Sequence, residues 1–351
     1  MPRSSSLRLF ISVFAGAAGM LLAPANTGAQ DLAITNARIV VGNGPVIERG
    51  TIIIRRGQIQ SVGSGDTQGL RTIDANGLTA MPGFVDAHRH INTGPEEKAQ
   101  MQALLEAGYT TVLSGGGPAE GNIVLRDRID KGELNGPRII PSGRIALANS
   151  TPESARAEVR RLAQLGVKYT GEISLTPVPG PTPQEIEVLK AIVDEGAKAG
   201  VAIQVHAVSA AAMMAAIDAG VRLLVHVPNK DWVSRAHAEK LAASGTKILA
   251  TIGFGAPIFG VFAQDNAPRF RDGRPWPQSI VDGVKVDGVV IGVEGGYTMV
   301  NSRTIWDANG ILGYCTDSTY APLAGLEHEL RTYNAMFSMP DIIKLMGPNT
   351  A

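Results

Sequence analysis

The sequence has 351 residues and equal numbers of basic and acidic residues, 32 of each. This length accommodates one large α/β domain or two smaller domains. The balanced charge argues against a nucleic-acid-binding protein, which would carry a basic patch. The single cysteine, Cys315, has no intramolecular partner, so a disulfide-stapled scaffold is excluded. The composition, 44% hydrophobic with 41 glycines and 21 prolines, is that of a loop-rich globular protein.

Residues 1–29 are predicted to be a signal peptide. Arg3 and Arg8 precede an uncharged apolar stretch from Leu9 to Leu22, and Thr27-Gly28-Ala29 has the small-x-small pattern that signal peptidase cuts. The alternative is an uncleaved anchor, but a spanning helix needs about 20 apolar residues, and this run is shorter. We therefore expect an exported protein, periplasmic or secreted, without a stable membrane anchor.

Residues 30–80 have the texture of a small β domain, because short apolar runs alternate with turn residues. Arg56-Gly57 is predicted to be a hairpin turn. The predicted strands are Ala33–Thr35, Arg38–Val41, Thr51–Ile54 and Gln58–Val62. We expect a small antiparallel sheet of the β-sandwich type.

Residues 81–351 alternate predicted strands with predicted helices. The strands are Gly83–Asp86, Thr110–Leu113, Arg138–Pro141, Val167–Ile173, Val201–His206, Arg222–His226, Lys247–Thr251 and Gly310–Thr316. The helices are Glu96–Ala107, Asn122–Leu134, Pro152–Leu165, Pro183–Ala199, Ala210–Ala219, Ser234–Ala243 and Thr298–Ala308. Eight such units in about 250 residues are typical of an α/β (β/α)8 TIM-like barrel. A doubly wound open sheet is the alternative, but its G-x-G-x-x-G fingerprint is missing, and Gly115–Gly117 is predicted to be a tight turn.

One connection is unusually long. Between Thr251 and Thr298 lie about 45 residues rich in glycine, proline and charge, including Arg269, Arg271, Arg274 and Trp276. Loops of this length are uncommon unless they are functional or disordered. We weigh two interpretations: a lid whose arginines pair with a substrate carboxylate, or a surface loop that touches nothing.

Five side chains of metal-binding type end predicted strands. His88 and His90 form an H-x-H pair at the end of the first strand, where residues i and i+2 share a face. His206, His226 and Asp317 end the fifth, sixth and eighth strands, and barrel enzymes place their catalytic groups at these carboxyl ends. Each residue alone is more simply a capped or hydrogen-bonded polar group. Together, imidazole and carboxylate groups indicate zinc or a similar divalent ion.

With these motifs the chain resembles the amidohydrolase superfamily, in particular its imidazolonepropionase-like and prolidase-like branch. The segments that carry the resemblance are Ile34–Arg38, Ile73–Ala75, Met81–His90, Val205–Ala207, Val225-His226, Thr316–Ser318 and Glu327–Leu330. The resemblance implies two divalent ions, with zinc expected. It implies that His88 and His90 bind one ion, that His206 and His226 bind the second, and that Asp317 is both ligand and proton shuttle.

The resemblance also implies a bridging ligand on the fourth strand, either a carboxylated lysine or a glutamate. The usual lysine would fall near Gly171. Lys168 and Glu172 lie on one strand face, four residues apart, and Glu172 is nearer the carboxyl end. We favour Glu172 and keep Lys168 as the alternative.

The chain departs from its relatives in two places. Many relatives carry a glycine-glycine-histidine segment after the third strand, which Arg144–Asn149 lacks. Relatives also continue for about fifty residues beyond the point where this chain ends, at Asn349–Ala351. We therefore expect a barrel truncated at its C-terminal end and an N-terminal sheet without its closing strands.

Three remaining residues receive simple interpretations. His237 is predicted to be solvated on a helix, and Cys315 to be strand packing. His328 is interpreted either as a residue supporting the site from behind or as a helix-surface residue.

These observations predict a metal-dependent hydrolase that cleaves a C–N bond of an amide, cyclic amide or dipeptide by a metal-activated hydroxide, with Asp317 moving the proton. The substrate would be a small molecule or dipeptide, and a homo-oligomer is compatible with the sequence. One alternative is hydrolysis of an ester, lactone or phosphotriester at the same site, since fold does not determine substrate. The other is a truncated, non-catalytic metal-binding protein.

Overall fold

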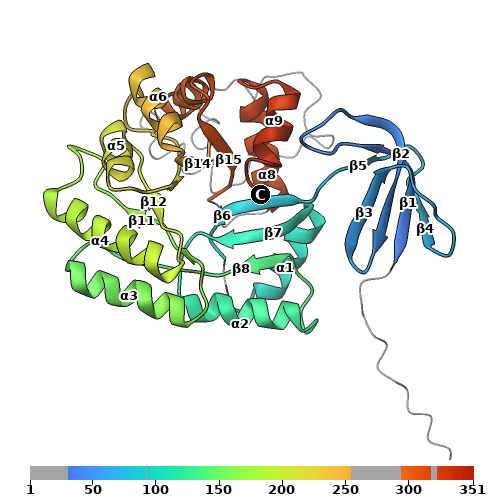
Figure 1. Cartoon of the computed structure of the whole chain (residues 1–351), viewed down its shortest axis with the longest axis horizontal. Coiled ribbons are helices and arrows are strands. Elements are labelled where there is room, and N and C mark those ends of the chain that lie inside the picture. The colour runs from blue at the N-terminus through green and yellow to red at the C-terminus, as the bar shows by residue number, and fades with distance from the viewer. Residues whose placement is uncertain (1–30, 92, 254–293, 318–321) are drawn as a thin grey trace, which may run out of the picture. The chain divides into compact units, whose positions relative to one another are not determined.

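The computed structural model describes residues 31–91, 93–253, 294–317 and 322–351. The predicted signal peptide, and Arg269, Arg271, Arg274 and Trp276 of the long connection, lie outside the described residues. The described chain forms two compact units (Figure 1): residues up to 40 with 46–80, and residues 41–45 with those from 81 onward. None of the described helices combines the length and apolar character needed to cross a bilayer.

The first unit is a five-stranded mixed sheet. Its strands are β1 (Leu32–Ile39), β2 (Ile47–Arg55), β3 (Gln58–Gly63), β4 (Arg71–Asp74) and β5 (Thr79–Ala80). The order is β3-β2-β1-β4, and β5 also pairs with β1. The β1–β2 and β2–β3 pairs are antiparallel as predicted, but β4 and β5 run parallel to β1. The prediction of a purely antiparallel sheet was therefore wrong.

Two turns explain how this sheet is built. Arg56 and Gly57 have φ of 52° and 73°, the left-handed pair that a two-residue hairpin needs, so the predicted turn is confirmed. Ala33–Thr35 and Arg38–Val41 were predicted as separate strands but belong to one strand, β1. Asn36, with φ of 54°, sits at a shift in register between β1 and β2, and a bulge of this kind lets one strand continue past an irregularity.

The second unit contains parallel strands in three groups. The first group is β6 (Phe84–Arg89), β7 (Tyr109–Ser114) and β8 (Arg138–Ile140); the second is β9 (Ser142–Gly143) with β10 (Tyr169–Thr170); the third is β11 (Ile173–Ser174), β12 (Gln204–His206), β13 (Leu223–Val225), β14 (Lys247–Ala250) and β15 (Ile311–Tyr314). All pairs within them are parallel. Just beyond β15, the N–H of Asp317 donates to the carbonyl of His88 in β6, at 2.9 Å. The end of the last strand therefore lies beside the end of the first.

The fourth predicted strand, Val167–Ile173, is broken into β10 and β11. Between them, the N–H of Gly171 donates to Gly143 at 2.7 Å and the N–H of Glu172 to Gly115 at 3.0 Å. The chain changes partner here, from β9 on one side to β12 on the other. A Cβ at Gly171 would lie 2.8 Å from the Cα of Gly116, so a glycine allows this close approach.

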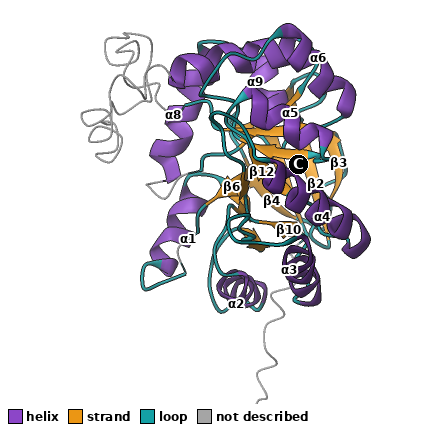
Figure 2. Ribbon diagram, turned by 90° about the vertical axis from the view of Figure 1, so that its left-hand side faces the viewer, coloured by secondary structure: helices purple, strands orange, loops and turns teal. Residues whose placement is uncertain are grey.

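Helices surround these strands on the outside, as Figure 2 shows. They are α1 (Glu97–Glu106), α2 (Ala119–Asp130), α3 (Pro152–Gln164), α4 (Pro183–Ala199), α5 (Ala210–Asp218), α6 (Arg235–Ser244), α8 (Pro322–Asn334) and α9 (Met339–Met346), together with helical residues 294–307. Thr151 and Thr182 cap α3 and α4 with capping boxes followed by proline. Helix α2 begins three residues before its predicted start because Gly121 packs closely on Thr93, and packing overrides low helix propensity. Residues 294–297, predicted as loop, are helical.

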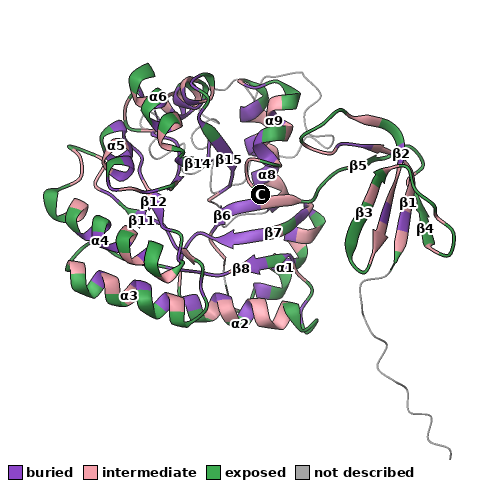
Figure 3. Cartoon of the chain, viewed as in Figure 1, coloured by how far each residue is buried: buried purple, intermediate pink, exposed green. Residues whose placement is uncertain are grey.

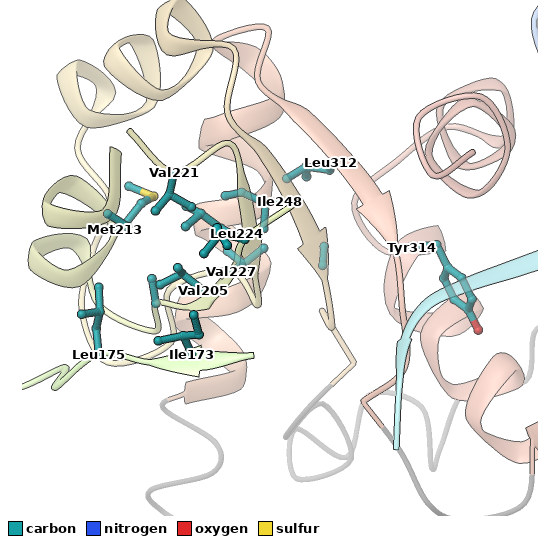
Figure 4. Close-up of a cluster of buried hydrophobic side chains, with 14 of the residues drawn as sticks. Ile173, Leu175, Val205, Met213, Val221, Leu224, Val227, Ile248, Leu312 and Tyr314 are labelled. Atoms are coloured by element: carbon teal, nitrogen blue, oxygen red, sulfur yellow. The ribbon is translucent and has the colours of Figure 1, made fainter. Parts of the chain in front are cut away.

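In the second unit, the strands and the inward faces of the helices are largely buried, whereas the outward helix faces are exposed (Figure 3). Ile173, Val205, Leu224, Ile248 and Leu312 come from five neighbouring strands and pack in one apolar cluster (Figure 4). A close-packed interior of this kind transmits little movement. The carboxyl ends of these strands are therefore held at defined positions.

Candidate metal centre

Six side chains converge at the carboxyl ends of the parallel strands. They are His88 from β6, His90 directly after β6, Glu172 from just before β11, His206 from β12, His226 directly after β13, and Asp317 from beyond β15. All six were predicted as metal ligands. Lys168, the alternative to Glu172, is exposed.

Glu172 lies among four imidazole rings. Its Oε2 is 2.8 Å from Nδ1 of His206, 3.4 Å from Nε2 of His226 and 3.7 Å from Nε2 of His88. Its Oε1 is 3.7 Å from Nε2 of His90. One carboxylate oxygen thus faces His90, and the other faces His88, His206 and His226.

Asp317 faces three of the same rings. Its Oδ1 is 2.9 Å from Nε2 of His90 and 3.3 Å from Nε2 of His88, and its Oδ2 is 3.5 Å from Nε2 of His226. The rings of His206 and His226 meet edge to face with centroids 4.6 Å apart. Nitrogen and oxygen donors therefore surround a common space.

The donor set fits divalent metal ions. Nε2 of His88, Nε2 of His226 and Oδ1 of Asp317 are buried atoms without a hydrogen-bond partner in the part of the chain that the structure describes, and buried polar atoms normally have one. Three groups have ligand atoms within 4.8 Å of one another: His88–His226–Asp317, His88–His90–Glu172 and Glu172–His206–His226. Imidazole nitrogens and carboxylate oxygens are common zinc ligands. Glu172, His88 and His226 each belong to two of these groups, and of the three only Glu172 carries two carboxylate oxygens.

The electrostatics favour ionised carboxylates. Burial raises the pKa of Glu172, but the hydrogen bond with His206 and the neighbouring imidazoles of His226 and His88 outweigh it and hold the pKa well below its usual range. The pKa of Asp317 is likewise held low by His88 and His90 against the effect of burial. Burial lowers the pKa of His226, which favours the neutral imidazole that a metal ligand requires.

Two of the six residues have an uncommon backbone conformation. His226 has φ of 69° and Asp317 has φ of 49°, the left-handed region that residues other than glycine seldom occupy. His226 directly follows β13, and Asp317 lies three residues beyond the end of β15. Strain of this kind is concentrated at functional sites.

A buried charge pair supports the centre and was not identified from the sequence. Asp86 and Arg89 in β6 are fully buried, 3.6 Å apart. Oδ1 of Asp86 accepts hydrogen bonds from the backbone N–H of Thr316 at 3.1 Å and of His88 at 3.3 Å, and Oδ2 accepts from Oγ1 of Thr316 at 2.5 Å. The available signal was two opposite charges at the end of an apolar strand, Asp86 before the H-x-H motif and Arg89 as its middle residue.

Thr251 was also missed. Its Oγ1 lies 2.6 Å from Nδ1 of His226. When the ring coordinates a metal through Nε2, Nδ1 carries the hydrogen, and an acceptor at this position fixes the ring orientation. Thr251 follows β14 and is buried, and nothing in its local sequence distinguishes it from other strand-end threonines.

The predicted tight turn at Gly115–Gly117 is confirmed, with φ of 155° at Gly116 and 127° at Gly117. The turn also packs against the centre, which the sequence did not reveal. A Cβ at Gly115 would lie 2.8 Å from Nε2 of His88 and 2.9 Å from Cε1.

Gly115→Ala is therefore expected to displace the His88 ring and to weaken metal binding about tenfold or more, the scale of changes around a ligand. Competition with a chelator measures the affinity. Gly136→Ala is the matched control, because its Cβ would meet Cδ1 of Ile129 at 2.8 Å, away from the centre. Equal metal affinities in the two variants would contradict the proposed contact.

The remaining predicted residues lie as follows. Arg144 begins the segment Arg144–Asn149, which lacks the glycine-glycine-histidine sequence of many relatives. Its side chain is exposed, and its Nη2 atom lies 4.0 Å from Oε1 of Glu172. Cys315 is fully buried packing, as predicted. His237 lies on α6, outside the centre. His328 is buried in α8, so its interpretation as a helix-surface residue was wrong.

Comparison with known proteins agrees with this geometry. A family model described as "Amidohydrolase family" matches residues 79–256. Enamidase from Eubacterium barkeri is 27% identical over 191 residues, which are 48% of this chain and 47% of that protein, so the match spans about half of the relative.

Solved structures show the fold. A Bifidobacterium longum protein described provisionally as a prolidase superposes with a TM-score of 0.74 at 24% identity, over 91% of this chain and 82% of the other. An Xaa-Pro dipeptidase with methionine bound in its active site has a TM-score of 0.70 at 19% identity, over 90% and 87% of the two chains. The mixed α/β fold of the chain thus matches those of prolidase-type structures.

Proposed function

Since the chain belongs to the amidohydrolase family, we propose that it is a metal-dependent hydrolase that cleaves a C–N bond of an amide, a cyclic amide or a dipeptide. The observation that carries this proposal is the convergence of four histidines and two carboxylates at one edge of the strands. Enamidase and Xaa-Pro dipeptidase, the names of two similar proteins, denote enzymes of C–N bonds.

The strands form a closed (β/α)8 barrel under this proposal, with the N-terminal sheet as a separate small domain. The contact between the ends of β15 and β6 supports closure, because it joins the last parallel strand to the first. Barrel enzymes bind their substrates at the carboxyl ends of the strands, which is where the six side chains lie.

We propose two divalent ions, zinc by the nature of the donors, with Glu172 as the shared ligand. His88 and His90 would hold one ion with Glu172, and His206 and His226 the other. Such ions supply an activated water and polarise the carbonyl that is attacked. Asp317, ionised and next to three imidazoles, accepts the proton of the attacking water and delivers it to the leaving nitrogen. The hydrogen bonds that buried Asp86 accepts from Thr316 and from the backbone of His88 keep His88 and Asp317 at a constant separation.

The physiological setting follows from the N-terminal sequence. The basic residues, the apolar stretch and the small-x-small site of residues 1–29 support export to the periplasm or the exterior. The substrate would then be a small molecule or dipeptide met outside the cytoplasm. Detection of a mature protein beginning near Gln30 in the periplasmic or secreted fraction tests this.

Metal content tests the centre. We expect elemental mass spectrometry to find about two divalent ions per purified chain, and His88→Ala to remove at least one of them. His237→Ala is the matched control, because this histidine lies on α6 outside the centre, and it should retain both ions. A folded protein that takes up no metal would refute the proposal and favour a non-catalytic role.

A substrate panel tests the bond that is cleaved. Amides, cyclic amides and dipeptides are compared with esters, lactones and phosphotriesters on the metal-loaded protein. Preferential hydrolysis of C–N bonds is expected. Turnover restricted to esters or phosphotriesters would refute the proposed specificity for C–N bonds but would leave the proposed metal centre intact.

A further inference from the structure

Three buried side chains of helix α8 form hydrogen bonds with the backbone at and just beyond the carboxyl end of β14. His328, Glu329 and Tyr333 are between 0% and 4% exposed. None of them lies in the candidate metal centre, and the proposed mechanism does not use them. Tyr333 donates from its hydroxyl to the carbonyl of Ala250 at 3.1 Å.

His328 and Glu329 hold three backbone groups of Ile252 and Gly253. The N–H of Gly253 lies 2.9 Å and 3.0 Å from the two carboxyl oxygens of Glu329, and the N–H of Ile252 donates to Oε2 at 3.1 Å. Nε2 of His328 donates to the carbonyl of Gly253. Gly253 is therefore held from both sides. A Cβ there would lie 2.5 Å from Cδ2 of His328 and 2.7 Å from Oε1 of Glu329, so these contacts leave room for glycine and for no larger residue.

The backbone segment held by α8 includes Thr251, which contacts a residue of the candidate metal centre. Thr251 lies between Ala250 and Ile252, both held by α8, and its hydroxyl contacts Nδ1 of His226 at 2.6 Å. The backbone N–H of His226 in turn donates to Leu249 of β14 at 2.9 Å. The position of the β14 end thus determines where the Thr251 hydroxyl lies, and with it the orientation of the His226 ring.

We infer that Glu329 is a positioning residue for His226, acting through the backbone of Ile252 and Gly253 and the hydroxyl of Thr251. The inference rests on the proposed metal centre. A buried carboxylate that accepts several N–H groups holds a backbone segment more firmly than apolar packing does, because the hydrogen bonds are directional. Supporting groups one step removed from a ligand commonly change metal affinity by about 10- to 100-fold when mutated.

Glu329→Gln tests the inference, because the amide replaces one acceptor oxygen by a donor that faces two N–H groups. Burial raises the pKa of Glu329 to about 8, against the effect of the two N–H groups, so affinity for Zn²⁺ is measured at pH 8.5 by chelator competition. We expect affinity to fall about tenfold. Glu327→Gln, on the same helix but only partly buried, is the matched control and should bind as the parent does.

A double-mutant cycle separates positioning from general loosening. Thr251→Val should weaken Zn²⁺ binding about as much as Glu329→Gln, and Thr251→Ser, which keeps the hydroxyl, should restore it. Because both residues act on the same ring, the double variant should bind no more weakly than Thr251→Val alone. Additive losses, or an unchanged affinity in Glu329→Gln, would overturn the inference.

Two further outcomes are distinguishable. If Glu329→Gln does not fold, Tyr333→Phe removes one hydrogen bond between α8 and the same backbone segment and should lower affinity a few-fold; parental affinity would overturn the inference. A parent protein that binds no Zn²⁺ would instead refute the proposed function on which the inference rests.

Discussion

Asp317→Asn is expected to lower kcat for amide hydrolysis by about 10²- to 10⁴-fold, the usual contribution of a positioned acid–base group. The carboxylate lies next to three imidazoles, which keep its pKa low and the group ionised. Asparagine retains the shape and tolerates the left-handed φ of 49° at this position. The substitution therefore removes the charge and the proton acceptor without adding backbone strain. Steady-state kinetics on metal-loaded protein measure the effect.

Metal content of the same samples must accompany the kinetics, because Asp317 is also a candidate ligand. Asp307→Asn is a suitable control, since Asp307 pairs with Arg303 on the exposed helix surface, and it should leave kcat unchanged. Parental activity in a metal-loaded Asp317→Asn protein would show that another group moves the proton.

The convergence of the candidate ligands was predictable because it follows from the fold pattern. His88, His206 and His226 each end an apolar run, and the carboxyl ends of parallel strands converge in α/β enzymes. Glu172 was favoured because it lies four residues nearer the carboxyl end of the predicted strand than Lys168. The structure then brings all these side chains within a few ångströms of one another.

The supporting residues could not be predicted, because their roles arise from contacts between distant segments. Asp86 meets Thr316 across 230 positions of sequence, and Glu329 meets Gly253 across 76. Gly115 carries no local sign that it packs on His88. Strand β4 was missed for a different reason. All four of its residues are exposed, so it has no apolar alternation for a sequence pattern to detect.

Asp86→Asn is expected to be the most destabilising single change near the centre. Arg89 is fully buried and would lose its carboxylate partner. Removing one member of a buried ion pair costs up to about 3–5 kcal/mol, and Arg89 would keep its hydrogen bond to Oγ1 of Thr316 but lose the opposite charge. Urea unfolding of the metal-free protein measures this loss. Asp127→Asn, which removes an exposed partner of Arg126, is the control and should change stability by less than about 1 kcal/mol.

The same substitution should also weaken metal binding, because Asp86 holds both Thr316 and the backbone of His88. A second variant distinguishes the two effects. Replacing the pair together, Asp86→Leu with Arg89→Met, removes both buried charges, and apolar replacements of buried pairs are often neutral for stability. We expect this variant to recover most of the lost stability and yet to bind metal poorly, because Thr316 has lost its acceptor. Recovery of both properties would mean that the pair serves stability alone. Recovery of stability without metal affinity would mean that the Asp86–Arg89 pair sets the separation between the H-x-H strand and Asp317 through its contacts with Thr316 and His88.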